Sequence, residues 1–208
     1  MPYFKNNYIN LLFIHIPKTG GTSLEEYFSK KYKLPLNNRS LYNFLKPNRF
    51  LNMDSSLQHL TYNTIMKYKH IFNIDTNNIK IISIIRDPYN RVVSDLFFLK
   101  IIEIGSSQED VFTALHKYLI DSNDNHNMPQ YLFITKDNVL INDIKILHCE
   151  TLKEDMINLG YKDFNYYENC NSNKVNYDNY LNENSINLIN TFYDKDFELL
   201  NYCKRTFC

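Results

Sequence analysis

The chain has 208 residues, enough for one domain with a buried core, and its 23 basic residues balance 23 acidic ones. Zero net charge gives no general attraction to nucleic acid or to an anionic membrane. Polar residues at positions 5–7 and 10 interrupt any apolar leader, and the longest later apolar run, 81–85, is too short to span a bilayer. We therefore expect a soluble, cytoplasmic protein with neither nucleic acid nor membrane as a partner.

The cysteines give no sign of a metal centre. They show neither C-x-x-C spacing nor a companion histidine, which argues against a zinc site and against a dense disulfide framework. A bridge between Cys203 and Cys208 is left open. The sequence also has no acidic cluster of the kind that holds magnesium, so we expect no bound metal.

Residues 11–24, LLFIHIPKTGGTSL, carry the clearest functional signal. An apolar run ends at Pro17, and a glycine pair is followed by two hydroxyl residues, which predicts a strand, a loop and a helix over 22–32. The glycines allow a ligand to approach the backbone, the helix start offers unpaired N–H groups, and Lys18 adds positive charge. A tight turn without a ligand would explain the glycines but not Pro, Lys, Thr and Ser together. The stretch therefore predicts a phosphate-binding site.

This order of residues differs from that of the nucleoside-triphosphate loop, G-x-x-x-x-G-K-[ST], because Lys18 precedes both glycines. It resembles instead the 5′-phosphosulfate loop of the sulfotransferases that use 3′-phosphoadenosine 5′-phosphosulfate (PAPS). The resemblance implies that the loop residues bind the 5′-phosphosulfate of PAPS; they are Pro17, Lys18, Thr19, Gly20, Gly21, Thr22 and Ser23.

The next segment, 34–56, contains two prolines and several asparagines with little periodicity, so we expect a long loop near the site. Thr61 is then expected to cap a helix. His59 stands just before this cap, where a histidine taken alone is more often structural. The segment QHLT, however, resembles the one that supplies the catalytic histidine in the branch of the family containing carbohydrate O-sulfotransferases. The resemblance therefore implies that His59 is the base.

A second motif follows the run KIISIIR over 80–86, which predicts a buried parallel strand. Asp87 and Pro88 indicate a turn into a helix that reaches about Leu99. Arg86 and Ser94 resemble the 3′-phosphate site of the same sulfotransferases, where an Arg at a strand end and a Ser eight residues later hold the phosphate. A helix cap with an Arg–Asp surface pair is the alternative interpretation.

The remaining segments predict further helices at 108–120 and 183–202, a short apolar segment at 131–134 and a third core strand at 143–148. Thr151 is expected to cap a helix that Gly160 ends. His116 and His126 receive no role. The polar run 168–179 loosely resembles the late loop that closes over the cofactor in this family, and that likeness adds Lys174 to the cofactor site. The end of the last helix, YDKDFELLNY, resembles the C-terminal helix of the family.

Together these elements predict a single α/β domain over 1–208, with a doubly wound, mainly parallel sheet flanked by helices. The resemblance implies the P-loop NTPase-like sulfotransferase fold and sulfuryl transfer from PAPS to a hydroxyl of a small-molecule or glycan acceptor, without a metal. In that mechanism His59 is the base, and Lys18 stabilises the leaving phosphate. Two alternatives are a phosphotransferase with an atypical phosphate loop and a non-catalytic nucleotide-binding module.

The chain also departs from the family in two ways. Animal carbohydrate sulfotransferases are usually anchored in the Golgi, and this chain shows no anchor, which favours a bacterial or viral source or a shortened chain. The chain is short and has zero net charge, so a long basic groove for a polyanionic glycan is not expected. A neutral or lightly charged sugar is the expected acceptor.

Overall fold

The computed structural model describes residues 2–42, 55–121, 124–165 and 175–206. Lys174, Cys170, Cys208 and most of the expected loop 34–56 lie outside these residues. In the described ranges, no helix combines the length and the apolar character that crossing a bilayer requires.

The central element is a four-stranded sheet in the order β1-β2-β3-β6. Its strands are β1 (Tyr3–Lys5), β2 (Asn10–Ile14), β3 (Lys80–Ile85) and β6 (Ile144–His148). β3 pairs in parallel with β2 and with β6, and β1 runs antiparallel to β2. A mixed α/β fold with a mainly parallel sheet is therefore confirmed, whereas the finer assignment to a doubly wound P-loop fold stays a prediction.

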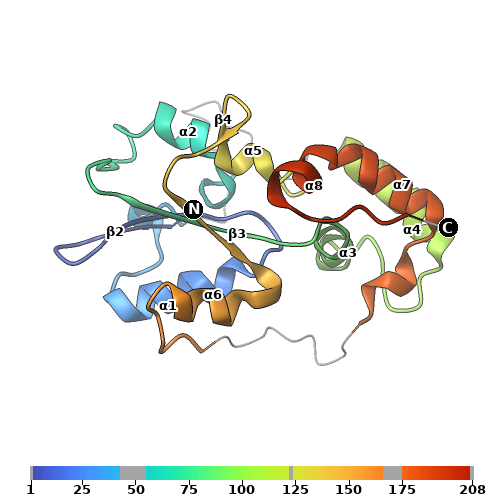
Figure 1. Ribbon diagram of the computed structural model, residues 1–208, viewed down its shortest axis with the longest axis horizontal. Helices are drawn as coiled ribbons and strands as arrows, with labels where there is room; N and C mark the ends of the chain where they lie inside the picture. Colours follow the sequence, from blue (N-terminus) through green and yellow to red (C-terminus); the bar gives the residue numbers. More distant parts are fainter. Residues whose placement is uncertain (1, 43–54, 122–123, 166–174, 207–208) are drawn as a thin grey trace.

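Helices cover both faces of the sheet (Figure 1). α1 (Gly21–Tyr32) and α6 (Leu152–Asn158) lie on one side, and α2 (Tyr62–Lys67) and α5 (Tyr131–Ile134) lie on the other. Successive β2 side chains alternate accordingly: Leu11 and Phe13 pack with the α1 side, and Leu12 and Ile14 with the α2 side. Because both faces are buried, the strand is apolar from Leu11 onward, as the sequence predicted.

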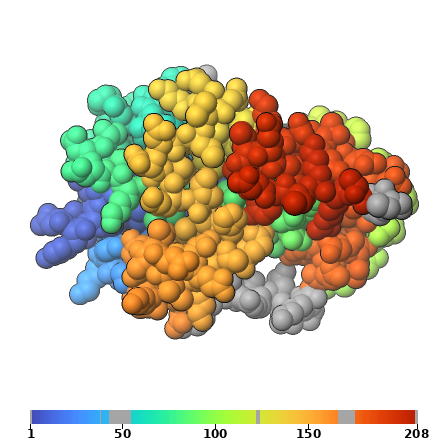
Figure 2. Space-filling model, in the orientation of Figure 1, coloured from blue at the N-terminus to red at the C-terminus, as the bar shows by residue number. Residues whose placement is uncertain are grey.

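A second group of helices packs around its own apolar cluster beyond the carboxyl end of β3 (Figure 1). It contains α3 (Pro88–Phe98), α4 (Gln108–Ile120), α7 (Glu183–Phe192) and α8 (Asp194–Leu200). In Figure 2 the C-terminal helices, in red, lie against the yellow part of the chain and far from the blue N-terminal strands. The functional candidates lie where this group meets the sheet.

Short elements complete the described chain. β4 (Thr135–Lys136) and β5 (Val139–Leu140) form a hairpin. Within the described ranges, the larger elements are joined by the 3₁₀ turns η1 (Asn38–Ser40), η3 (Leu57–His59), η4 (Cys149–Thr151) and η5 (Tyr177–Tyr180).

Two local predictions are wrong. The helix expected over 183–202 breaks at Tyr193, whose buried side chain donates its hydroxyl to the Asn127 carbonyl. Immediately afterwards, Asp196 accepts hydrogen bonds from backbone N–H groups of the α5 segment. Thr151 does not cap α6, because its hydroxyl bonds the Asp155 carboxylate instead. In both places a tertiary or side-chain contact replaces the local signal.

Left-handed backbone is common in this chain. Twelve described residues other than glycine have φ between 48° and 66°, five of them Asn and three Asp. The glycines with positive φ lie at 88–96°, outside that range. Asparagine and aspartate tolerate this conformation better than other side chains.

Candidate active site

The loop between β2 and α1 is held by its own hydrogen bonds. Lys18 has φ 66° and Gly20 has φ 88°, so the chain turns sharply before α1 begins. The buried Thr19 hydroxyl donates to the Ile16 carbonyl at 2.8 Å. Because that hydroxyl is used within the loop, any contact of Thr19 with an anion would come from its backbone N–H.

Two arginines fix the outer side of this loop. Arg91, only 1% exposed, donates from Nε to the Pro17 carbonyl at 3.0 Å. Arg86 donates from Nη1 to the Lys18 carbonyl at 3.0 Å. In a trans peptide the N–H points opposite to the carbonyl, so the N–H groups of Lys18 and Thr19 face away from the guanidinium groups. The loop therefore presents consecutive backbone donors on its other side, as anion binding requires.

Arg86 is itself positioned by Gln130. The Gln130 amide accepts from Arg86 N at 2.9 Å and donates to Arg86 O at 2.8 Å, which fixes the end of β3. The guanidinium lies over the Tyr177 ring, 5.6 Å from its centroid. Ser94 is half-buried in α3, and among the described residues no hydrogen bond joins it to Arg86. The expected pairing of Arg86 and Ser94 on one phosphate stays a prediction.

The Lys18 ammonium lies over the ring of Phe98, 3.9 Å from its centroid. Burial lowers the pKa of this amine, against the Asp95 charge, and the nearby Arg86 lowers it further. Within the described ranges, Nζ makes neither an ion pair nor a hydrogen bond. A cation held mainly by an aromatic face is free to turn toward an incoming anion.

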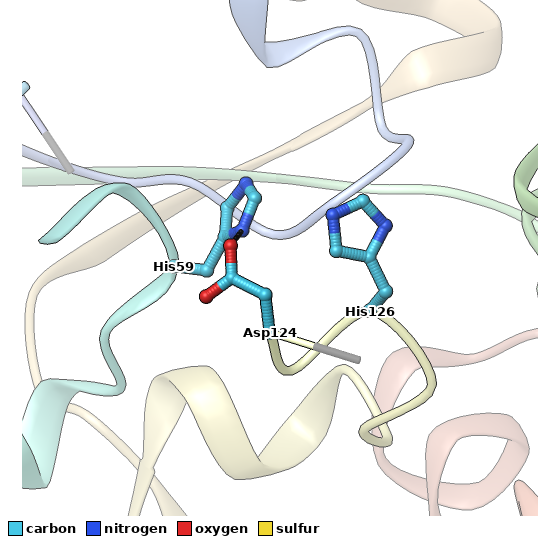
Figure 3. A group of neighbouring side chains, drawn as sticks. All are labelled: His59, Asp124 and His126. Carbon is cyan, nitrogen blue, oxygen red and sulfur yellow. Dashed lines mark hydrogen bonds and ion pairs between the residues drawn. The ribbon is translucent and has the colours of Figure 1, made fainter. Parts of the chain in front are cut away.

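His59 lies in η3, directly before α2, and Thr61 caps that helix as predicted. Its Nδ1 is 2.8 Å from Asp124 Oδ2 (Figure 3). Burial, opposed by the hydrogen bond to Asp124, lowers the pKa of His59 to about 4, and the neighbouring histidines contribute in the same direction. The ring is therefore neutral near pH 7.

Asp124 fixes the tautomer of that ring. Its carboxylate also accepts from the backbone N–H and from the hydroxyl of Ser56, the latter at 2.8 Å. Burial acts to raise the pKa of Asp124, but these hydrogen bonds and His59 outweigh it, and the net pKa is below the usual value. Because the carboxylate can only accept, the proton of neutral His59 lies on Nδ1, and Nε2 carries a lone pair.

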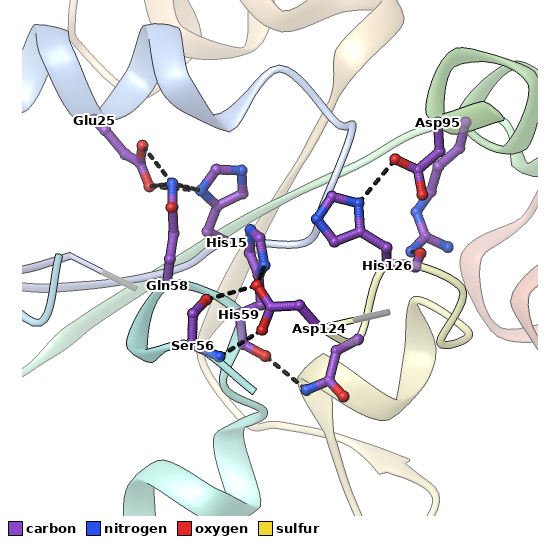
Figure 4. Close-up of polar contacts among 10 residues, drawn as sticks. His15, Glu25, Ser56, Gln58, His59, Asp95, Asp124 and His126 are labelled. Atoms are coloured by element: carbon purple, nitrogen blue, oxygen red, sulfur yellow. Dashed lines mark hydrogen bonds and ion pairs between the residues drawn. The ribbon is translucent and has the colours of Figure 1, made fainter. Parts of the chain in front are cut away.

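A second buried histidine, His15, packs against His59. His15 Nδ1 is 2.5 Å from Glu25 Oε1, and the Gln58 amide donates to the same carboxylate (Figure 4). The His15 ring meets the His59 ring edge-on, with 5.4 Å between centroids. It also lies against Gly21: a Cβ at that position would be 2.5 Å from ring atoms of His15. A glycine at position 21 is therefore needed for the close approach of the His15 ring.

His126 occupies the other side of His59, with 4.9 Å between ring centroids. Its Nδ1 is 2.8 Å from Asp95 Oδ1, and its ring stacks on Phe98. Phe98 therefore contacts both His126 and Lys18. The structure brings the two predicted catalytic residues, Lys18 and His59, into one chain of side-chain contacts.

His59, Asp124 and His126 together could hold a metal ion, since one ligand atom from each lies within 4.8 Å of the others (Figure 3). The expectation of no metal was based on cysteine spacing and on the lack of an acidic cluster. These three ligands come instead from two segments that are distant in the chain. In the structure, however, the Asp124 carboxylate is already engaged by Ser56 and His59. Asp124 therefore orients the His59 ring, and the expectation of no bound metal stays a prediction.

A cavity of about 380 Å³ opens beside the start of α1, and Thr22, Ser23 and Tyr27 line part of it. Thr22 is exposed and Ser23 half-buried at this point. The two hydroxyl residues predicted to contact the donor therefore stand between the loop and an open space.

Several site residues were not predicted from the sequence: His15, Arg91, Asp124 and Gln130. A signal existed for His15, a single imidazole directly after an apolar strand, and for Arg91, an arginine on the same helix as Ser94. No local pattern marked Asp124 or Gln130, because their partners are distant in the chain.

A family model described as the sulfotransferase family matches residues 2–203. Searches of curated proteins and of solved structures each gave no match. The family match covers the loop, the Arg86 motif and all three histidines.

Proposed function

Because the chain belongs to the sulfotransferase family, whose members transfer a sulfuryl group, we propose that it is a PAPS-dependent O-sulfotransferase acting on a small-molecule or glycan acceptor. A neutral or lightly charged sugar fits the zero net charge best. The observation that most directly supports this proposal is the neutral His59, oriented by Asp124 and linked through His126 and Phe98 to Lys18.

The donor would be held by two groups of residues. The N–H groups of the loop 17–23, the start of α1 and the Lys18 ammonium suit the 5′-phosphosulfate. Arg86, with Ser94 farther along α3, suits the 3′-phosphate, and a guanidinium matches a phosphate in charge and geometry. Lys174 belongs to the same proposal, although it lies outside the described residues.

In the reaction, the acceptor oxygen forms a bond to sulfur while the bond from sulfur to the bridging oxygen breaks. His59 Nε2 takes the proton of the acceptor hydroxyl, a contribution of roughly 10²- to 10⁴-fold. Asp124 stabilises the imidazolium that forms. Lys18 and the loop N–H groups stabilise the charge that develops on the bridging oxygen, worth about 3–4 kcal/mol for a key donor. Adenosine 3′,5′-bisphosphate is the leaving group.

Calorimetric titration of the EDTA-treated protein with adenosine 3′,5′-bisphosphate, in parallel with ATP plus magnesium, tests the donor. We expect tight, metal-independent binding of the bisphosphate and little binding of ATP. Binding of ATP alone would favour a phosphotransferase, since phosphoryl transfer uses magnesium to bridge the phosphates. Binding of neither ligand would contradict a nucleotide site in the loop.

Two variants then separate binding from catalysis. Arg86→Ala should weaken bisphosphate binding by roughly 10- to 100-fold, because a charged donor to phosphate is lost. The matched control is Arg39→Ala, which removes an exposed arginine outside the site. His59→Ala should abolish transfer from labelled PAPS and leave bisphosphate affinity nearly intact. Undiminished transfer by this variant would remove His59 from the role of base.

A further inference from the structure

His126 is built like His59 but has no role in the reaction described so far. Its Nδ1 lies 2.8 Å from Asp95 Oδ1, and Tyr118 donates to the other Asp95 oxygen at 2.7 Å. Asp95 is 1% exposed. Burial acts to raise its pKa, but His126, Tyr118 and Arg91 outweigh burial and keep the carboxyl ionised. The Nδ1 proton of His126 is therefore directed at Asp95, and Nε2 is the nitrogen left for a ligand.

The His126 ring lies beside the His59 ring. The two rings meet at 84° with centroids 4.9 Å apart, and ring nitrogens of both lie within 4.8 Å of each other and of Asp124. In Figure 4 the His126 nitrogen that is not bonded to Asp95 points toward the side where His59 lies. Neither Nε2 has a hydrogen bond to any described residue. Two buried histidines thus each have a ring nitrogen without a partner among the described residues.

Two ring nitrogens without partners call for two hydrogen-bonding groups. A monohydric acceptor bound at His59 would leave the His126 nitrogen without a partner. Adjacent hydroxyl groups on one acceptor would satisfy both.

We propose that His126 is a second acceptor-binding residue, selecting acceptors with two adjacent hydroxyl groups, one donating to His59 and the other hydrogen-bonded to His126. This inference rests on the proposed function and adds to it a determinant of acceptor choice. The determinant is a vicinal diol, in contrast to an isolated alcohol or phenol.

The Arg91 side chain supports this role by linking the backbone at His126 to the loop 17–23. Arg91 donates from Nη2 to the His126 carbonyl at 2.6 Å and from Nε to the Pro17 carbonyl at 3.0 Å. Phe98 lies against the His126 ring and under the Lys18 ammonium. His126 is thus fixed relative to the loop proposed to hold the sulfuryl donor, as a specificity-determining residue should be.

The test compares transfer from labelled PAPS to cis-cyclohexane-1,2-diol and to cyclohexanol. For the unmodified protein we expect kcat/KM for the diol to exceed that for the alcohol by roughly 10- to 100-fold. His126→Asn keeps an N–H near the position of Nδ1 for Asp95 but removes Nε2, so the ratio should fall to near one while bisphosphate binding persists. The control, His116→Asn, changes an exposed histidine of α4 and should leave the ratio unchanged.

The outcomes separate this inference from the proposed function. Equal use of the two alcohols, or a ratio unaffected by His126→Asn, would overturn the role of His126 and leave the sulfotransferase proposal standing. A protein that binds the bisphosphate but does not sulfate the diol would also contradict the inference, since only the two hydroxyl groups are invoked. Failure to bind the bisphosphate would count against the proposed function itself.

Discussion

Replacing Gly21 with alanine tests how tightly the loop and the histidines are packed together. Gly21 is the first residue of α1, where alanine would ordinarily stabilise a helix by about 1 kcal/mol over glycine. Here the added Cβ would lie 2.5 Å from Cδ2 and Nε2 of His15, whereas carbon atoms in good contact are about 3.5–4.0 Å apart. The imidazole would therefore have to move by roughly 1 Å.

The surroundings of His15 oppose such a movement. The ring is 5% exposed, lies 2.5 Å from Glu25 Oε1 through Nδ1, and stacks on Phe13 with 5.6 Å between centroids. Overpacking costs about 1–3 kcal/mol, and weakening a hydrogen bond to a charged group costs about 1.5–3 kcal/mol. After the helix-propensity gain is subtracted, we expect a net loss of about 2–4 kcal/mol of folding free energy.

Thermal and urea unfolding measure this loss. For a chain of this length, Tm should fall by roughly 5–15 °C. Lys30→Ala, an exposed change in the same helix, should alter stability by less than about 0.5 kcal/mol. In a His15→Ala background the Gly21→Ala step should cost much less, because the colliding ring is absent. A Gly21→Ala protein as stable as the parent would refute the reasoning.

Three further predictions concern the site. The unfolded chain binds a proton at His59 below about pH 6.5 and the folded chain only below about pH 4, so unfolding free energy should fall as the pH drops through this window, by roughly 3 kcal/mol from His59 alone. Urea unfolding across that range should show a shallower fall for His59→Gln. Asp124→Asn should lower kcat by roughly 10²- to 10⁴-fold, because the imidazolium loses its counter-charge, and unchanged kcat would exclude the orienting role. Arg91→Lys should destabilise the fold by about 1–3 kcal/mol for each of the Pro17 and His126 carbonyls left without a donor, and weaker bisphosphate binding in calorimetry should accompany the loss.

Elements with local signals were predictable from the sequence. Residues 81–85 are apolar except for Ser83, and Pro88 marks the start of α3. The strand and the helix were therefore predicted within a residue or two. Thr61 caps α2 by accepting a hydrogen bond from the Thr64 N–H, and these two residues are only three positions apart in the sequence. Tyr193 shows the opposite case, because the break there depends on the Asn127 carbonyl, more than sixty residues away.

The candidate site divides along the same line. Lys18 and Arg86 belong to contiguous motifs and could be identified from residue order alone. Asp124 could not, since it meets His59 across 65 residues of chain and has the left-handed φ of 48°. Asp124 meets His59 only when η3 and the segment after α4 have folded against each other. The same holds for His126, which the sequence left without a role.

The many left-handed asparagines have a consequence for how this protein can move. A glycine at such positions would relieve about 1–2 kcal/mol of steric cost, but it would also enlarge the conformational entropy of the unfolded chain. The chain has only four glycines in 208 residues, so most of the described left-handed positions are occupied by residues whose side chains restrict the backbone. The chain therefore offers few glycine hinges. At the described turns, movement would then come from rotation of side chains such as Lys18 and Phe98 more than from glycine hinges.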